Sequence, residues 1–182
     1  GGGPAGSTVA RYAAENGINA LVIDARKSIG TPLQCGELVP SNDEMRRLCP
    51  DVPDMDDLFK TPEHAVSKRC EKMKIITPSG KSLSYPFEGL ILNRVAHDEA
   101  LVALAKKAGA KYQVNTYVKD IEGNKITTRK GEEITAKVIV GAGGHKDPVR
   151  RKFWNEKSIN IPVKFELKGG TYGDDVELHF GS

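Results

Sequence analysis

The chain opens on a glycine-rich run, residues 1–6, which reads Gly-Gly-Gly-Pro-Ala-Gly. This run fits the pattern G-x-G-x-x-G through Gly1, Gly3 and Gly6. In a parallel sheet the first glycine makes a tight turn, the second lets the backbone approach a pyrophosphate, and the third lets a helix pack closely on a strand. A loop of this kind normally joins a strand to a helix, so it favours an α/β fold that binds a dinucleotide. The alternative is that these are the glycines of a tag or linker.

The residues after the glycines supply the rest of a βαβ unit. The alanine-rich stretch 7–16 predicts a helix that stops at Gly17, and the apolar run 20–23 predicts a buried strand. Asp24 closes this strand 18 residues after Gly6, near the spacing at which a carboxylate meets an adenosine ribose hydroxyl. A solvated strand end is the alternative for Asp24. Helix and strand in this order raise the glycine pattern from a weak signal to a strong one.

No apolar strand and no Met precede Gly1. The glycine pattern requires a strand before it. We therefore expect this chain to be a piece of a longer protein, with the first strand of its sheet missing, that folds poorly and is inactive alone.

Charge and cysteine content exclude several classes of function. Basic residues exceed acidic ones by only 3 and form no basic stripe, so we expect no nucleic acid partner. Cys35, Cys49 and Cys70 form no C-x-x-C or zinc spacing and the four histidines are dispersed, so we expect no metal site and a reduced, cytoplasmic compartment. No apolar run is long enough to span a bilayer, so we expect a soluble protein.

Other patterns predict a mixture of helices and strands. Residues 28–62, rich in Pro, Gly, Asp and Met, form an extended excursion with a short helix at 44–48. Asn93 predicts the cap of a helix that begins near Arg94 and stops at Gly109. The predicted strands are a hairpin at 73–77 and 81–85, a strand at 111–115, a meander over 117–136, a buried strand at 138–140, and antiparallel strands at 161–167 and 176–180.

Residues 32–37, Pro-Leu-Gln-Cys-Gly-Glu, form the most unusual hexapeptide of the chain. Cys35 and Glu37 follow the second predicted strand, and ligands of such sheets lie outside the carboxyl ends of the strands, so both side chains could reach a cofactor. The equally open alternative is a small apolar Cys35 and a solvated Glu37. Arg26, two residues after Asp24, lies either beside the adenosine or on the surface. The carboxylate of Asp24 argues against the 2′-phosphate of NADP because it would repel that group.

Residues 1–37 together resemble the amino-terminal signature of the geranylgeranyl reductase family of flavoproteins, which includes the archaeal digeranylgeranylglycerophospholipid reductases. The resemblance rests on the glycine loop, on Asp24 and Arg26 as an acid-x-Arg element, and on Pro32, Cys35, Gly36 and Glu37 as a P-x-x-C-G-E element. It continues at 92–94, Asp98, Leu101 and 136–142. The P-x-x-C-G-E element is much more specific than the glycines.

The resemblance implies an FAD-dependent oxidoreductase of the para-hydroxybenzoate hydroxylase fold, which saturates C=C bonds in the geranylgeranyl chains of membrane glycerolipids. The implied architecture is α/β: a Rossmann-type, GR2-like FAD-binding sheet without its first strand, with part of an antiparallel β substrate domain. The FAD-binding domain would comprise 1–60 and 90–150, and the substrate domain 61–89 and 151–182. Cys35 is the implied catalytic residue, close to the flavin. The implied cofactor-binding residues are Gly1, Gly3, Pro4, Ala5, Gly6, Asp24, Ala25, Arg26, Cys35, Gly36, Arg94 and Ala142.

The chain departs from the family pattern in several places. The family often has Ala-Asp-Gly where this chain has Ala142-Gly143-Gly144, so a carboxylate contact from position 143 is absent. The ribose-binding acid is commonly Glu, whereas this chain has Asp24. The chain also stops at Ser182, before the family's Gly-Asp motif and its aromatic motif, so we expect half of the pocket to be missing.

Two rival functions keep the FAD-binding fold: an aromatic-ring monooxygenase, and an electron-transfer or lipid-binding flavoprotein without its own turnover. The reductase hypothesis calls for a prenylated glycerolipid as substrate and for ferredoxin, a deazaflavin or NADPH as electron donor. It also leaves contact with a membrane surface open. Phe153 and Trp154, which follow the basic residues 150–152, are typical of a packed helix face, with a lipid-headgroup contact as the alternative.

Overall fold

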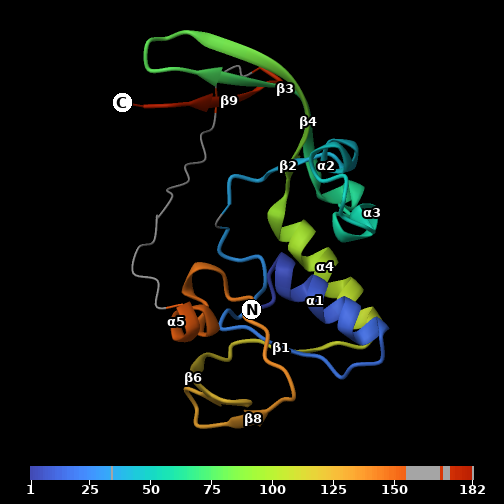
Figure 1. Ribbon diagram of the computed structural model, residues 1–182, viewed down its shortest axis with the longest axis vertical. Helices are drawn as coiled ribbons and strands as arrows, with labels where there is room; N and C mark the ends of the chain where they lie inside the picture. The colour runs from blue at the N-terminus through green and yellow to red at the C-terminus, as the bar shows by residue number, and fades with distance from the viewer. Residues whose placement is uncertain (34, 155–168, 170–172, 182) are drawn as a thin grey trace. The chain divides into compact units, whose positions relative to one another are not determined.

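The computed structural model describes residues 1–33, 35–154, 169 and 173–181. The chain divides into two compact units, shown in Figure 1. Unit 1 comprises Gly1–Leu33 and Asp98–Val163, and unit 2 comprises Gln34–His97 and Lys164–Ser182. The assignment of residues to an FAD domain and a substrate domain stays a prediction.

Unit 1 begins with the predicted helix and strand. Helix α1 (Pro4–Glu15) is followed by strand β1 (Leu21–Ile23), and Gly17 between them adopts a left-handed φ of 74° that suits a glycine. Helix α4 (Arg94–Ala108), which belongs to unit 1 from Asp98 onward, leads into strand β5 (Lys111–Gln113), and β5 pairs with β1 in parallel. These elements confirm the predicted helices, the two strands and the α/β class.

Small side chains form the core of this part of unit 1. Ala10 of α1, Val22 of β1, Ala105 of α4 and Ala110 are buried together, and Figure 1 shows α1 and α4 side by side. Alanines let the two helices approach the strands closely, because no long side chain separates the backbones. The Asn93 side chain accepts a hydrogen bond from the Ala96 amide at 3.1 Å, which confirms the predicted cap of α4.

The predicted meander is also confirmed. Strands β6 (Val118–Glu122), β7 (Lys125–Thr128) and β8 (Glu133–Thr135) form an antiparallel sheet in sequence order. A short 3-10 turn, Gly144–Lys146, then leads into helix α5 (Pro148–Trp154).

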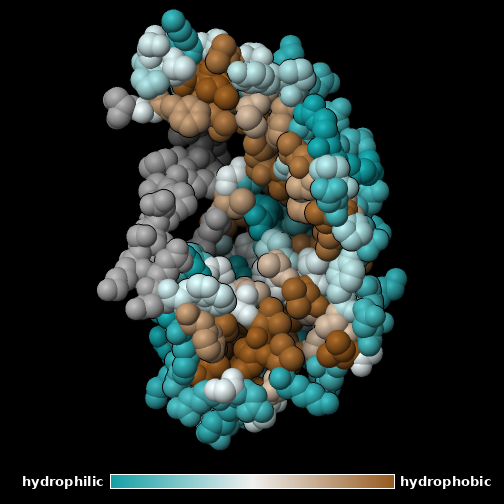
Figure 2. Space-filling model, viewed as in Figure 1, coloured by the Kyte–Doolittle hydropathy of each residue, from teal (hydrophilic) through white to brown (hydrophobic). Residues whose placement is uncertain are grey.

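The prediction of a buried strand at 138–140 is wrong. These residues form no strand, and Val138 and Val140 are 77% and 55% exposed. None of the described strands pairs with residues 138–140, so the apolar run lacks the hydrogen-bonded neighbour that a strand requires. Figure 2 shows apolar atoms on the surface of unit 1 in this view.

Unit 2 is built on a long hairpin. Strands β3 (Val66–Ile76) and β4 (Ser82–Leu92) pair in antiparallel register, with β2 (Leu38–Pro40) beside β4 and β9 (Val176–His179) beside β3. The hairpin prediction is confirmed, although both strands are longer than predicted, and Gly80 in its turn has a φ of 79°. A 3-10 turn, Glu63–Ala65, precedes β3. The predicted short helix appears as α2 (Asn42–Leu48), followed by α3 (Met55–Leu58).

The predicted direction of strand 176–180 is wrong, because β9 pairs with β3 in parallel. Alternation along a strand indicates that its two faces differ in exposure and carries no information on the direction of the neighbouring strand. The predicted strand at 161–167 lies outside the described residues. Within the described part of the chain, none of the helices has the length and apolar content needed to cross a bilayer.

Candidate functional site

At three positions of the glycine loop of unit 1, the neighbouring atoms leave no space for a side chain. A Cβ atom added at Gly1 would lie 2.7 Å from the Ala142 carbonyl oxygen, one at Gly2 would collide with the Ile29 side chain, and one at Gly6 would collide with the Gly1 carbonyl oxygen. At Gly1 and Gly6, where the clashing atom belongs to the backbone, a glycine is therefore required by the packing of the protein itself, whereas at Gly2 the Ile29 side chain would have to shift.

Gly3 differs from these three glycines. A Cβ added there would meet only the Arg26 Nη2 atom, at 4.0 Å, and its backbone (φ −69°, ψ −171°) suits any residue. Gly3 is also the N-cap of α1 and offers no side chain to the amides of the first helical turn, which holds no acidic residue. The space above Gly3 thus adjoins the positive end of a helix, where an anionic group is favoured.

Asp24 lies beside this loop and is 4% exposed. Its carboxylate accepts four hydrogen bonds: from the Gly2 amide at 2.7 Å, and from the Arg26 amide, Nε and Nη2 at 2.8, 3.0 and 2.9 Å. The Asp24 amide donates to the Gln113 carbonyl oxygen at 3.0 Å, so the position of Asp24 is fixed by β5. The sequence predicted that Asp24 meets the ribose of a cofactor held by the loop; the structure places the carboxylate beside the loop, and the ribose contact stays a prediction.

These hydrogen bonds keep Asp24 ionised. Burial alone would raise the pKa of its carboxyl group, but the bonds from the Arg26 side chain, the Gly2 amide and the Arg26 amide outweigh burial and lower the pKa to about 2. The pKa of Arg26 is raised chiefly by its hydrogen bonds to Asp24, and the charge of Asp98 acts in the same direction. The site therefore holds a fixed negative charge at the end of β1.

Arg26 contributes two of the four hydrogen bonds through its side chain, which is 33% exposed. A carboxylate offers about four acceptor positions, so a diol that donates to Asp24 has to displace the Arg26 guanidinium at least in part. The backbone bonds from Gly2 and Arg26 can stay in place. Asp24 and Arg26 thus form a pair that a ligand can open, a feature that the sequence alone did not indicate.

Three further residues support the site and were missed by the sequence analysis. The Tyr112 hydroxyl donates to Ser7 Oγ at 3.0 Å, and the buried Ser7 hydroxyl donates to the Gly2 carbonyl oxygen at 2.9 Å, which ties β5 to the loop. Asp147 lies under the loop at residues 141–144, and its carboxylate accepts from the Gly143 amide. Asp147 is followed by Pro148, a helix-start signal that could have identified it as a capping residue.

Seven further residues were predicted to belong to the site. Three of them lie in unit 2 and four in unit 1. Cys35 is partly exposed and its Sγ atom accepts from the Glu37 amide at 3.4 Å. Gly36 has open space around it, and Arg94 is the first residue of α4. The four in unit 1 are Pro4 and Ala5 at the start of α1, Ala25 between Asp24 and Arg26, and Ala142 against Gly1. The roles of all these residues stay predictions.

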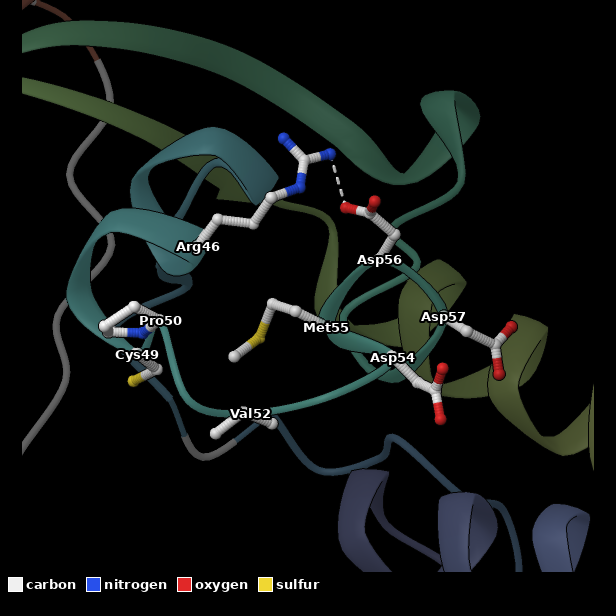
Figure 3. A pocket seen from close by; sticks show the side chains of 8 residues that line it. All are labelled: Arg46, Cys49, Pro50, Val52, Asp54, Met55, Asp56 and Asp57. Carbon is white, nitrogen blue, oxygen red and sulfur yellow. Dashed lines mark hydrogen bonds and ion pairs between the residues drawn. The ribbon is translucent and has the colours of Figure 1, made fainter.

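Unit 2 also holds an open hollow of about 550 Å³ beside α2 and α3, shown in Figure 3. Its lining consists of Arg46, Cys49, Pro50, Val52, Asp54, Met55, Asp56 and Asp57. Arg46 forms an ion pair with Asp56, while the Asp54 and Asp57 side chains point away from Met55 in Figure 3. The carboxylates therefore do not converge on one point, and no group of described residues has the arrangement of a metal site.

The chain is similar in sequence to known proteins over nearly its whole length. It is 37% identical over 147 residues to an uncharacterized protein in the nifH2 5′ region of Methanosarcina barkeri, and the match covers 79% of each chain. It is 30% identical over 196 residues to digeranylgeranylglycerophospholipid reductase 1 of Methanosphaera stadtmanae, covering 99% of this chain and 46% of that reductase. The chain thus spans about half the length of the curated reductases that it matches. No protein-family model matches it.

Solved structures share the fold. A geranylgeranyl bacteriochlorophyll reductase-like protein from Thermoplasma acidophilum is 31% identical, with a TM-score of 0.62 over 75% of this chain and 36% of that chain. The halogenase PltM, solved in complex with FAD, is 18% identical with a TM-score of 0.64, over 85% of this chain and 35% of its own. The second likeness concerns the fold alone.

Proposed function

Because the chain belongs to the geranylgeranyl reductase family, we propose that the protein binds FAD non-covalently and reduces isolated C=C bonds in the geranylgeranyl chains of glycerolipids. The observation that carries the proposal is the open space at Gly3. Packing against backbone atoms explains the glycines at positions 1 and 6, whereas the packing at Gly3 does not require a glycine and leaves room for a ligand to approach the backbone.

The residues of unit 1 fit the adenosine diphosphate half of FAD. Gly3 and the first turn of α1 would receive the pyrophosphate, because amides at the start of a helix favour an anion and no acidic side chain opposes it. Asp24 would accept from the adenosine ribose hydroxyls after the Arg26 side chain moves away. The negative charge of an ionised Asp24 also disfavours a 2′-phosphate, which supports FAD over an NADP-type ligand.

The proposed chemistry needs a protein group as well as a cofactor. FAD, once reduced, supplies the electrons for saturating the double bond. An isolated alkene is a poor electron acceptor, so a proton has to be delivered to one carbon in a site from which water is excluded. We assign this proton delivery to the Cys35 thiol, since the P-x-x-C-G-E element is the most specific part of the resemblance. The fold alone does not select the reaction, because a halogenase shares it.

The proposal includes the partners of the reaction. The substrate is a prenylated glycerolipid, and the electrons come from ferredoxin, a deazaflavin or NADPH. Contact with a membrane surface is supported by Phe153 and Trp154 at the end of α5, which are 65% and 71% exposed beside Arg151. We propose that the protein works in the cytoplasm at that surface.

We expect Asp24→Ala to weaken FAD binding by about tenfold to a hundredfold, which corresponds to the loss of hydrogen bonds to a charged group. Titration with FAD, followed by quenching of flavin fluorescence, measures the dissociation constant. Asp120→Ala is the matched control. Asp120 is an exposed carboxylate of unit 1 that forms an ion pair with Lys152, and both residues are distant in sequence from the glycine loop. Equal FAD affinity in Asp24→Ala and Asp120→Ala would remove Asp24 from the cofactor site.

A further inference from the structure

The Asp147 carboxylate is buried, with the residue 6% exposed, and it holds two elements at once. One oxygen accepts from the Gly143 amide, and the other accepts from the Arg150 amide at 2.9 Å, which caps α5. The Asp147 amide in turn donates to the Gly144 carbonyl oxygen at 3.1 Å. Asp147 therefore fixes the loop at residues 141–144 through hydrogen bonds to the last two residues of that loop, Gly143 and Gly144.

The same loop is shaped to receive this carboxylate. A Cβ at Gly141 would lie 2.7 Å from Asp147 Oδ1, and a Cβ at Gly143 would lie 2.7 Å from Asp147 Oδ2. Both glycines flank Ala142, so the absence of their side chains is what lets the carboxylate reach the backbone. This packing gives a physical reason for Gly143, the position at which the chain lacks the carboxylate of the family pattern.

Ala142 contacts the glycine loop on its other side. Its carbonyl oxygen would lie 2.7 Å from a Cβ at Gly1, and its Cβ would lie 3.3 Å from a Cβ at Gly6. Gly1 and Gly6 are thus packed against Ala142, whose neighbour Gly143 is hydrogen-bonded to Asp147 and whose other neighbour, Gly141, lies close to the same carboxylate. The contacts form a continuous path from a buried carboxylate to the loop that carries Gly3.

We propose that Asp147 is a positioning residue for FAD: by holding Ala142 against Gly1 and Gly6, it keeps the glycine loop in the conformation that receives the pyrophosphate. The inference rests on the proposed function for its ligand. In this role Asp147 does not itself contact the cofactor. Its effect passes through Ala142, so it should change the affinity for FAD even where the stability of the protein is preserved.

The test separates positioning from helix capping. Ser at position 147 still caps a helix about as well as Asp, because its hydroxyl reaches the Arg150 amide, but it is too short to reach Gly143. We expect Asp147→Ser to unfold near the wild-type temperature and to bind FAD about tenfold more weakly. Ser41→Ala is the control, since Ser41 accepts from the Glu44 amide to cap α2, and its loss should lower the unfolding temperature without changing FAD affinity.

A second variant tests the same contact from the other side. Gly143→Ala puts a methyl group against Asp147 Oδ2 and should weaken FAD binding in the wild-type background. In an Asp147→Ser background the Oδ2 clash is gone and the 3.0 Å approach to the Cα of residue 147 remains, so the added effect of Gly143→Ala should be smaller than in the wild type. Additive effects of the two substitutions on FAD affinity would overturn the inference, as would wild-type affinity in Asp147→Ser.

The exchange rate of backbone amide hydrogens tests the positioning role of Asp147 in the absence of FAD. Asp147→Ser should speed exchange of the Gly2 amide, which is bonded to Asp24 within the glycine loop. Unchanged exchange at Gly2 would overturn the positioning role. Failure of the wild-type protein to bind FAD would instead contradict the proposed function, so the two outcomes are distinguishable.

Discussion

In a Gly3→Val variant we expect the protein to fold as the wild type does and to bind FAD at least about a hundredfold more weakly. Valine fits the backbone angles at position 3, and a Cβ there meets no protein atom closer than 4.0 Å. Its branched side chain would stand between the first turn of α1 and the pyrophosphate. Circular dichroism measures the fold, and absorbance of the flavin that remains after gel filtration measures binding.

Two other glycines supply the comparison. Gly181→Val places the same side chain in open space outside the loop, so it should leave both folding and FAD binding unchanged. Gly6→Val should damage folding itself, because a side chain there collides with the Gly1 carbonyl oxygen. Stoichiometric yellow protein from Gly3→Val would show that the space above Gly3 has another purpose.

The second large effect is expected in turnover. If Cys35 delivers the proton, Cys35→Ala should keep FAD and slow alkene reduction by about 10²–10⁴-fold, the usual contribution of a general acid. Cys35→Ser should be intermediate, because a hydroxyl of similar size is a weaker acid but still a donor. Lipid mass spectrometry in single-turnover reactions with chemically reduced protein gives the rate.

Cys49→Ala is the matched control for Cys35. Cys49 is likewise a free, partly exposed cysteine of unit 2, and it lines the open hollow beside α2. Its substitution should leave the rate unchanged. Equal rates in Cys35→Ala, Cys49→Ala and the wild type would return Cys35 to the role of a small apolar residue.

Much of unit 1 could be predicted from the sequence because its signals are local. The glycine loop, α1 and β1 follow one another within 23 residues. The spacing between Gly6 and Asp24 alone predicts that Asp24 lies at the end of β1. The hairpin of unit 2 and the cap at Asn93 could also be predicted from the sequence. A turn that contains Pro and Gly, and a capping side chain, both act on residues close to them in the chain. Such features require no knowledge of distant partners.

The errors and omissions concern partners that lie far apart in sequence. An apolar run at 138–140 resembles a strand, but a strand also needs a hydrogen-bonded neighbour, and none of the described strands supplies one. Asp147 was missed because its importance arises from contacts with Gly141 and Gly143, which only the folded chain reveals. The bidentate pairing of Arg26 with Asp24 was missed for a different reason, because an arginine two residues from an acid is compatible with a surface position as well.

Reduction of prenyl double bonds by this protein can be measured by incubating the chemically reduced protein with a geranylgeranyl glycerolipid and determining the mass of the lipid by mass spectrometry. We expect the lipid to gain two hydrogen atoms for each bond saturated, and we expect this gain to require bound FAD. An unchanged lipid mass in a preparation that holds stoichiometric, reduced FAD would contradict the proposed function.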